Sequence, residues 1–197
     1  MSTPGRPKCE FRRAQHGGFP ITALRSAAIL LSIAVLIGEA AAGDRPHEHG
    51  VARLDVAVEG KRIVLQLESP LDNLVGYEHA PRNDAERQRA DAVVAKLKDA
   101  DQLFEIDGGA QCKLAKVTLQ SAALGLEASA PPAAGEHGDL DGTYEFECRN
   151  AGRAGFIDVA LFDVFPRLAR IDVQAIAPKG QLKATLRRPS RRIALVR

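Results

Sequence analysis

Side chains able to bind a metal ion gather at two places in the first half of the chain. His47 and His49 bracket a glutamate in HEHG, and Glu78 and His79 are neighbours in GYEHAP. Residues two apart in an extended backbone project to the same side, so one ion could lie roughly 2.0–2.1 Å from a nitrogen of each HEHG histidine. Two ligands hold zinc weakly. A useful site needs a third, and Glu78 or His79 is the candidate.

A third group of such residues is the stretch GEHGDLDG, which contains His137 and Asp139. The stretch is similar to a loop that captures metal ions with low affinity, although Asp141-Gly142 is equally a turn signal. The stretch has part of an EF-hand ligand series, so calcium is the weaker alternative. The alternative to any metal site is that HEH is an ordinary soluble terminus and that His79 hydrogen-bonds within a loop. The candidate metal ligands are thus His47, His49, His79, His137, Glu78 and Asp139.

Catalytic motifs are missing from the sequence. It has no GxSxG, no GxGxxG and no phosphate-binding glycine loop, and HEHG places its second histidine two residues after the first rather than four, as HExxH requires. We therefore expect a protein that is not an enzyme.

The N-terminal segment has the features of an export signal. The apolar run SAAILLSIAVLIG, residues 26–38, follows Arg25 and is followed by the small-residue pattern Ala40-x-Ala42. Such a run is shorter than the roughly 20 residues of a membrane-spanning helix. We predict that residues 1–42 are a cleaved signal peptide, that the mature protein is periplasmic, and that it has no membrane span after cleavage.

The charge of the remaining chain is close to neutral. Residues 1–42 contain five of the 27 basic and two of the 25 acidic residues, which leaves 22 basic and 23 acidic residues. Phosphate binding needs a concentrated basic surface. We therefore expect no nucleic-acid partner.

Cys112 and Cys148 are the two cysteines that remain after signal cleavage. An even pair in an oxidising compartment favours a disulfide. The alternative is a pair of zinc thiolates, which the absence of a CxxC spacing disfavours.

Alternating apolar residues predict a mostly β protein. Residues 51–58 and 62–69 alternate around the turn Glu59 to Lys61 and predict a hairpin, and Asn83 with Glu86 predicts the start of an amphipathic helix over about Asp84 to Lys98. Residues 125–142 have no periodic apolar face and predict a mobile loop. Further strand-like stretches are 102–106, 112–122, 143–148, 156–164 and 169–177, with 181–188 and 191–197 as additional candidates.

The fold class expected from this pattern is α+β and mostly antiparallel β. The sheet would be sandwich-like, or would form two small β lobes joined at the 125–142 loop, with one main amphipathic helix. Residues 43–197 would form a single metal-binding domain.

Several of these stretches together resemble the ZrgA-like family of exported, zinc-regulated bacterial proteins. The matching segments are HEHGVARLDVAVEG, LESPLDNLVGYEHAP with the following helix, LFEIDGGAQCKL, and YEFEC followed by FPRLARIDVQAIAPKGQLKATL. The resemblance covers nearly the whole mature chain. It implies a periplasmic zinc-binding protein that assists zinc uptake beside an ABC-type importer or its binding protein, with His47, His49, His79 and His137 as ligands. Many family members have a long His/Asp-rich tract where this chain has GEHGDLDG, so multi-ion storage is not expected to carry over.

Our leading hypothesis is a non-catalytic periplasmic accessory protein that binds Zn²⁺. Protons compete for imidazole, so binding should weaken from pH 7.5 to 5.5. Copper or nickel fits the same donors. The alternative is a metal-independent periplasmic interaction module that uses exposed β-edges or the loop around Tyr77. A metallohydrolase with Glu78 as general base is a weaker third hypothesis.

Overall fold

The first two strands form the predicted hairpin. In the computed structural model, which describes residues 48–126 and 138–195, β1 (Val51–Glu59) pairs antiparallel with β2 (Arg62–Pro70). Gly60 in the turn has φ of 57°, a left-handed conformation that glycine adopts without a steric penalty. Alternate residues of β1, including Leu54 and Val56, are fully or almost fully buried, because successive strand residues face opposite sides of a sheet.

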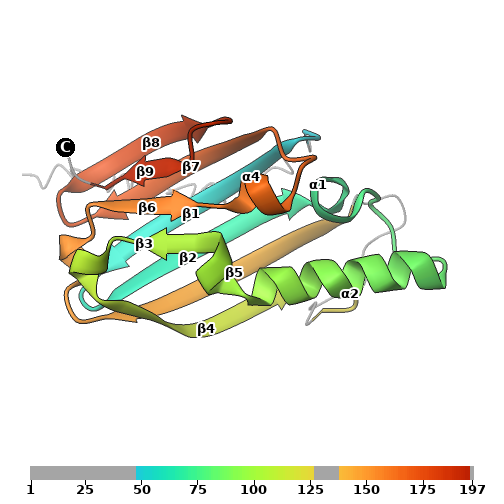
Figure 1. Ribbon diagram of the computed structural model, residues 1–197, viewed down its shortest axis with the longest axis horizontal. Coiled ribbons are helices and arrows are strands. Elements are labelled where there is room, and N and C mark those ends of the chain that lie inside the picture. The colour runs from blue at the N-terminus through green and yellow to red at the C-terminus, as the bar shows by residue number, and fades with distance from the viewer. Residues whose placement is uncertain (1–47, 127–137, 196–197) are drawn as a thin grey trace, which may run out of the picture. The chain divides into compact units, whose positions relative to one another are not determined.

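This hairpin lies at the centre of a six-stranded sheet (Figure 1). β1 and β7 are parallel, and every other neighbouring pair in this sheet is antiparallel. The mostly antiparallel sheet is therefore confirmed, with one parallel pair next to the central hairpin. The strand order is β4 (Cys112–Gln120), β5 (Asp139–Cys148), β2, β1, β7 (Arg170–Ala177) and β8 (Gly180–Leu186).

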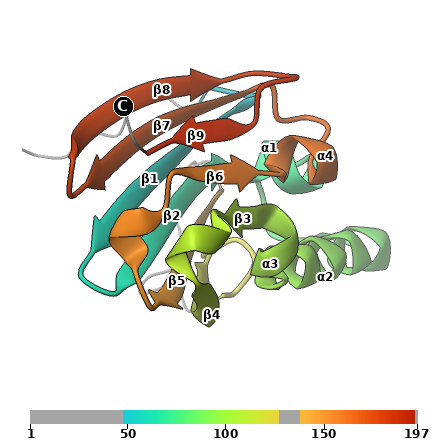
Figure 2. The same cartoon turned by 60° about the vertical axis from the view of Figure 1, so that its left-hand side comes forward.

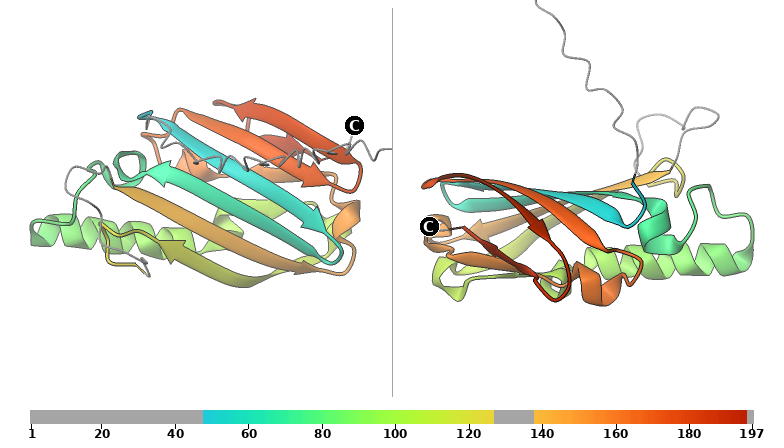
Figure 3. Two further views of the ribbon diagram at one scale, coloured as in Figure 1. Left: turned by 180° about the vertical axis from the view of Figure 1, so that it is seen from behind. Right: turned by 90° about the horizontal axis from the view of Figure 1, so that it is seen from above.

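A second layer covers one face of this sheet (Figures 2 and 3). It contains the three-stranded sheet with the order β3 (Phe104–Ile106), β6 (Phe156–Val159) and β9 (Arg192–Ala194), together with the helices. The core lies between the layers, where the ring of Tyr144 from β5 meets that of Phe104 edge-on, with 4.8 Å between centroids. Apolar burial between two layers is the arrangement expected of an α+β, sandwich-like fold, and it confirms the predicted class.

The predicted amphipathic helix is α2 (Asp84–Lys98). The side chain of Asn83 accepts a hydrogen bond from the amide of Glu86 at 2.9 Å, which satisfies a backbone donor in the first turn of the helix. Ala90, Val93 and Leu97 form the buried side of the helix. Within the described residues, no helix is both long and apolar enough to cross a membrane.

The structure differs from the sequence-based boundaries in three places. The predicted strand over residues 102–106 is shortened by the helix α3 (Ala100–Leu103), and the strand predicted over 156–164 ends at Val159 before the short helix α4 (Leu161–Val164). Short apolar runs do not distinguish a strand from a helical turn, which explains both differences. The predicted 125–142 loop also ends earlier, because β5 begins at Asp139; residues 127–137 lie outside the described residues.

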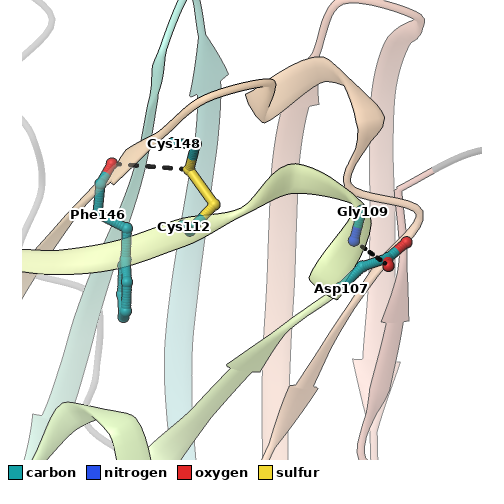
Figure 4. Close-up of a disulfide and its surroundings, with 5 residues drawn as sticks. All are labelled: Asp107, Gly109, Cys112, Phe146 and Cys148. Carbon is teal, nitrogen blue, oxygen red and sulfur yellow. Dashed lines mark hydrogen bonds between the residues drawn. A yellow bond between two sulfur atoms is a disulfide. The ribbon is translucent and has the colours of Figure 1, made fainter.

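The disulfide between Cys112 and Cys148 is confirmed (Figure 4). The two cysteines are direct partners in the β4–β5 register, and their Cα atoms are 3.9 Å apart. Nearby, the carboxylate of Asp107 accepts hydrogen bonds from the amides of Gly109, in the 3-10 helix η1 (Gly108–Ala110), and Gly155, which follows the 3-10 helix η2 (Ala151–Arg153). These bonds lower the pKa of Asp107. Both cysteine sulfurs are therefore consumed in a structural bond, which excludes the thiolate alternative.

Candidate metal site

Glu48, His49 and Gly50, the described part of HEHG, form a turn, here called the HEHG turn, that leads into β1. Gly50 has φ of 80°, which favours glycine, and its carbonyl accepts hydrogen bonds from the amides of Ala169 at 2.7 Å and Arg170 at 2.9 Å. The guanidinium of Arg170 also pairs with the carboxylate of Glu48 at 2.7 Å. His49 thus sits on a turn held by the chain segment just before β7.

A buried asparagine joins this turn to the short helix α1 (Leu71–Val75), which follows β2 directly. The side chain of Asn73 is 1% exposed, so its polar atoms need partners within the protein. Its oxygen accepts from the amide of Gly50 at 2.5 Å, and its nitrogen donates to the carbonyl of Val51 at 2.8 Å and to the hydroxyl of Ser69 at 3.2 Å. The HEHG turn and the segment SPLDNLVG therefore meet in space.

The imidazole of His49 lies between two carboxylates. Its Nε2 is 3.0 Å from Oε1 of Glu78, and its Nδ1 is 4.0 Å from Oδ2 of Asp72. The His49 side chain is 64% exposed, whereas those of Asp72 and Glu78 are 19% and 15% exposed. The ring is thus open to solvent, and the two acids beside it are largely shielded.

This geometry assigns different roles to the two ring nitrogens of His49. In the tautomer with its proton on Nε2, the nitrogen beside Glu78, the neutral ring keeps its lone pair on Nδ1, the nitrogen on the Asp72 side. A carboxylate that orients a histidine in this way is the usual outer partner of a metal-binding imidazole. Zinc bonds to nitrogen and oxygen are roughly 2.0–2.2 Å long, so two ligands of a tetrahedral ion lie about 3.4 Å apart, and the 4.0 Å between Nδ1 and Asp72 Oδ2 would have to shorten slightly for both to bind one ion.

The start of β5 lies against the backbone of Glu78. The amide of Gly138 donates to the Glu78 carbonyl at 3.1 Å, and the Gly138 carbonyl accepts from the amide of Leu71 at 2.8 Å. A Cβ atom at Gly138 would lie 2.9 Å from the Glu78 carbonyl oxygen and 2.8 Å from a methyl group of Leu71, so a larger residue does not fit without a shift. Gly138 therefore helps to fix the backbone of Glu78.

His79 belongs to a different group of contacts. Its ring stacks on Tyr77 with 5.0 Å between centroids, and its Nδ1 is 2.9 Å from the carbonyl of Ala80 and 4.0 Å from the carboxylate of Glu86. A hydrogen bond from Nδ1 to a carbonyl leaves the lone pair of the neutral ring on Nε2. The backbone amide of Arg82 donates to Glu86, and this bond is the main cause of a lowered Glu86 pKa. His49 and His79 are thus paired with different carboxylates.

Comparison with known protein families identifies the chain. A family model described as ZrgA family zinc uptake protein matches residues 46–195. The chain belongs to the ZrgA family. The match begins just before the HEHG turn and ends after β9, so it includes the six-stranded sheet and the second layer. A comparison with curated proteins finds no match to the chain.

The structure places the predicted ligands of this ZrgA family chain at different positions. His49 and Glu78 are brought together, His79 is placed against Glu86, and Asp139 begins β5 opposite Pro70. His47 and His137 lie outside the described residues. Within residues 48–126 and 138–195, no group of three or more His, Cys, Asp or Glu side chains is arranged to hold a metal ion.

Sequence reasoning missed three residues of the site. Asp72 and Asn73 lie in the segment SPLDNLVGYEHAP on which the family resemblance rests, and Arg167 pairs with Asp72 at 3.0 Å from a distant part of the chain. The adjacent acid and asparagine in that segment were the sequence signal that could have pointed to Asp72 and Asn73. Arg167 lies 95 positions after Asp72, and no local pattern points to it.

Proposed function

We propose that this protein binds zinc in the periplasm and assists zinc acquisition without catalysing a reaction. The observation that carries the proposal is the placement of His49 between Glu78 and Asp72, with its Nε2 3.0 Å from Glu78. Membership of a zinc uptake family supports zinc as the ion. The confirmed disulfide supports an oxidising compartment, because such bonds form and persist outside the cytosol.

In the proposed site, His49 Nδ1 and Asp72 bind the ion and Glu78 orients the imidazole. One nitrogen and one oxygen from the protein make an incomplete zinc shell, because zinc usually takes four ligands. Water or the histidines predicted from the sequence, His47 and His137, would complete it. Glu48, the chain neighbour of His47, pairs with Arg170, and Gly138, the chain neighbour of His137, donates to the backbone of Glu78. An exposed and incomplete shell suits an ion that is passed on rather than kept, and the acceptor we propose is an ABC-type zinc importer or its binding protein.

The test is calorimetric titration of zinc into the chain beginning at Gly43 with its disulfide formed. We expect saturable binding that falls more than tenfold in His49→Ala. Glu78→Gln should weaken binding by about ten- to a hundredfold, the usual effect of losing an outer partner of a ligand. The matched control is Asp163→Asn, which removes an exposed carboxylate paired with Arg191 and should leave binding unchanged. Binding that is absent, or that survives His49→Ala unchanged, would refute the site.

The outer face of the six-stranded sheet favours a second candidate function, a metal-independent protein-interaction module. A groove of about 470 Å³ crosses β1, β2, β7 and β8 on this face. Ile176, which lines it, is the large hydrophobic side chain that stands exposed among the described residues, at 54%. Replacing His47, His49 and His79 together by alanine separates the two functions. A zinc protein loses its ion and keeps its fold, whereas an interaction module keeps its partner.

A further inference from the structure

The carboxylate of Asp72 is shared between an imidazole and an arginine. Its Oδ2 is 4.0 Å from His49 Nδ1, and its Oδ1 is 3.0 Å from a terminal nitrogen of Arg167. Asp72 is largely shielded, at 19% exposed, whereas the Arg167 side chain is 57% exposed. The same carboxylate therefore has a cationic partner of its own before any ion arrives.

Arg167 is held in this position by the surrounding backbone. It lies between α4 and β7, two residues before Ala169, whose amide donates to the Gly50 carbonyl of the HEHG turn. Its guanidinium lies over Gly76, where a Cβ atom would be 3.7 Å from the guanidinium carbon. Gly76 ends α1 in the left-handed conformation with φ of 88°. The turn that carries His49 and the chain that carries Arg167 are thus fixed against each other.

We propose that Arg167 competes with the zinc ion for Asp72 and thereby sets how tightly the site holds its ion. This inference rests on the proposed function. A carboxylate bound to a guanidinium is a poorer metal ligand, because one of its oxygens already accepts a charge-assisted hydrogen bond. This competition lowers the affinity of the site and speeds the release of zinc.

The experiment compares zinc binding and release in four forms of the protein. They are the wild type, Arg167→Gln, Asp72→Asn and the double variant, each checked for folding by urea denaturation. Arg167→Gln should bind zinc roughly two- to fivefold more tightly, the upper part of the range expected for removing one partly exposed charge pair. Its release of zinc to a chelator in stopped flow should slow by a similar factor. In the Asp72→Asn background the same substitution should tighten binding by less than twofold, because the contested carboxylate is gone.

Arg191→Gln is the matched control. Arg191 is also an exposed arginine paired with one aspartate, at 3.4 Å from Asp163, and its substitution changes the net charge equally. We expect its zinc affinity to stay within twofold of the wild type. If Arg167→Gln does not fold, Arg167→Lys keeps the charge, weakens the contact with Asp72 and should give a smaller increase in affinity.

The outcomes separate this inference from the function on which it rests. If the wild type binds zinc through His49 but Arg167→Gln and Arg167→Lys both match Arg191→Gln, the competition is refuted and the zinc function stands. An equal gain from Arg167→Gln with and without Asp72 would also refute it, since a general charge effect would then suffice. Failure of every form to bind zinc would refute the proposed function itself.

Discussion

The side-chain oxygen of Asn73 lies 2.5 Å from the amide nitrogen of Gly50, 23 positions earlier in the chain. Together with the bond from its side-chain nitrogen to Val51, this contact fastens the turn that carries His49 to the helix that carries Asp72. The proposed site is therefore organised by a residue that is not one of its proposed ligands.

Replacing Asn73 by alanine should lower both stability and zinc affinity. The Gly50 amide and the Val51 carbonyl would lose a buried partner, which costs about 1–3 kcal/mol for each group left unsatisfied. Urea denaturation measures the loss. The control is Asn150→Ala, an exposed asparagine whose side chain makes no cap hydrogen bond, and it should change stability by less than about 0.5 kcal/mol. Equal effects of the two substitutions would contradict this role for Asn73.

Asp141→Asn should stabilise the protein at pH 7. Asp141 and Glu68 are direct partners in the β2–β5 register, and partial burial, followed by the Glu68 charge, raises the Asp141 pKa. The folded state therefore holds this proton more tightly than the unfolded chain does. Stability falls as pH rises through the interval from the unfolded value, about 3.9, to the folded one. We expect a gain of about 0.3–1 kcal/mol at pH 7 and little gain at pH 3, where the carboxyl is protonated.

Asp172→Asn is the counterpart of this experiment on the same sheet face. Its carboxylate lies 3.2 Å from Arg170 and accepts a hydrogen bond from Thr185 at 3.0 Å. Removing its charge should therefore lower stability at pH 7. Unfolding curves for both variants at pH 7 and pH 3 test the contrast, and a loss of stability at pH 7 in Asp141→Asn would rule out the repulsion.

Removing both cysteines should destabilise the fold by roughly 3–4 kcal/mol. Cys112 and Cys148 are 36 positions apart, and a crosslink that closes a loop of this length limits the entropy of the unfolded chain by about that amount. The measurement is urea denaturation of a Cys112→Ala/Cys148→Ala variant beside the oxidised wild type. The reduced wild type serves as the control and should match the variant. An unchanged midpoint would show that the bond constrains little.

Zinc affinity should fall when the pH is lowered from 7.5 to 5.5. Imidazole binds metal only as the neutral base, so protons compete directly with zinc for His49. Titrations at several pH values measure the change, with His49→Ala as the reference. A constant affinity over this range would mean that carboxylates alone hold the ion.

Much of the fold follows from local patterns, whereas the site depends on distant contacts. The alternation over Val51–Glu59 and the Asn83 cap are local features, and the hairpin and α2 appear where they were predicted. The helix α1 was missed because five residues are too few to show a helical period. The sequence motifs named Glu78 as a candidate partner of the HEHG histidines, and the structure places it beside His49. The contact of Asp72 with Arg167 could not be predicted, because sequence patterns say little about which loops meet.

The parallel pairing of β1 with β7 links assembly of the site to the end of chain synthesis. His49, Asp72 and Glu78 are all present once the first half of the chain has emerged, yet Glu48 of the turn pairs with Arg170, 122 positions later. Pairings between segments so far apart form late and slowly, because a long loop must close first. An incompletely synthesised chain therefore contains His49, Asp72 and Glu78 but does not yet hold them in the geometry of the proposed site. Binding of an ion by the proposed site should thus mark a molecule whose synthesis and folding are finished.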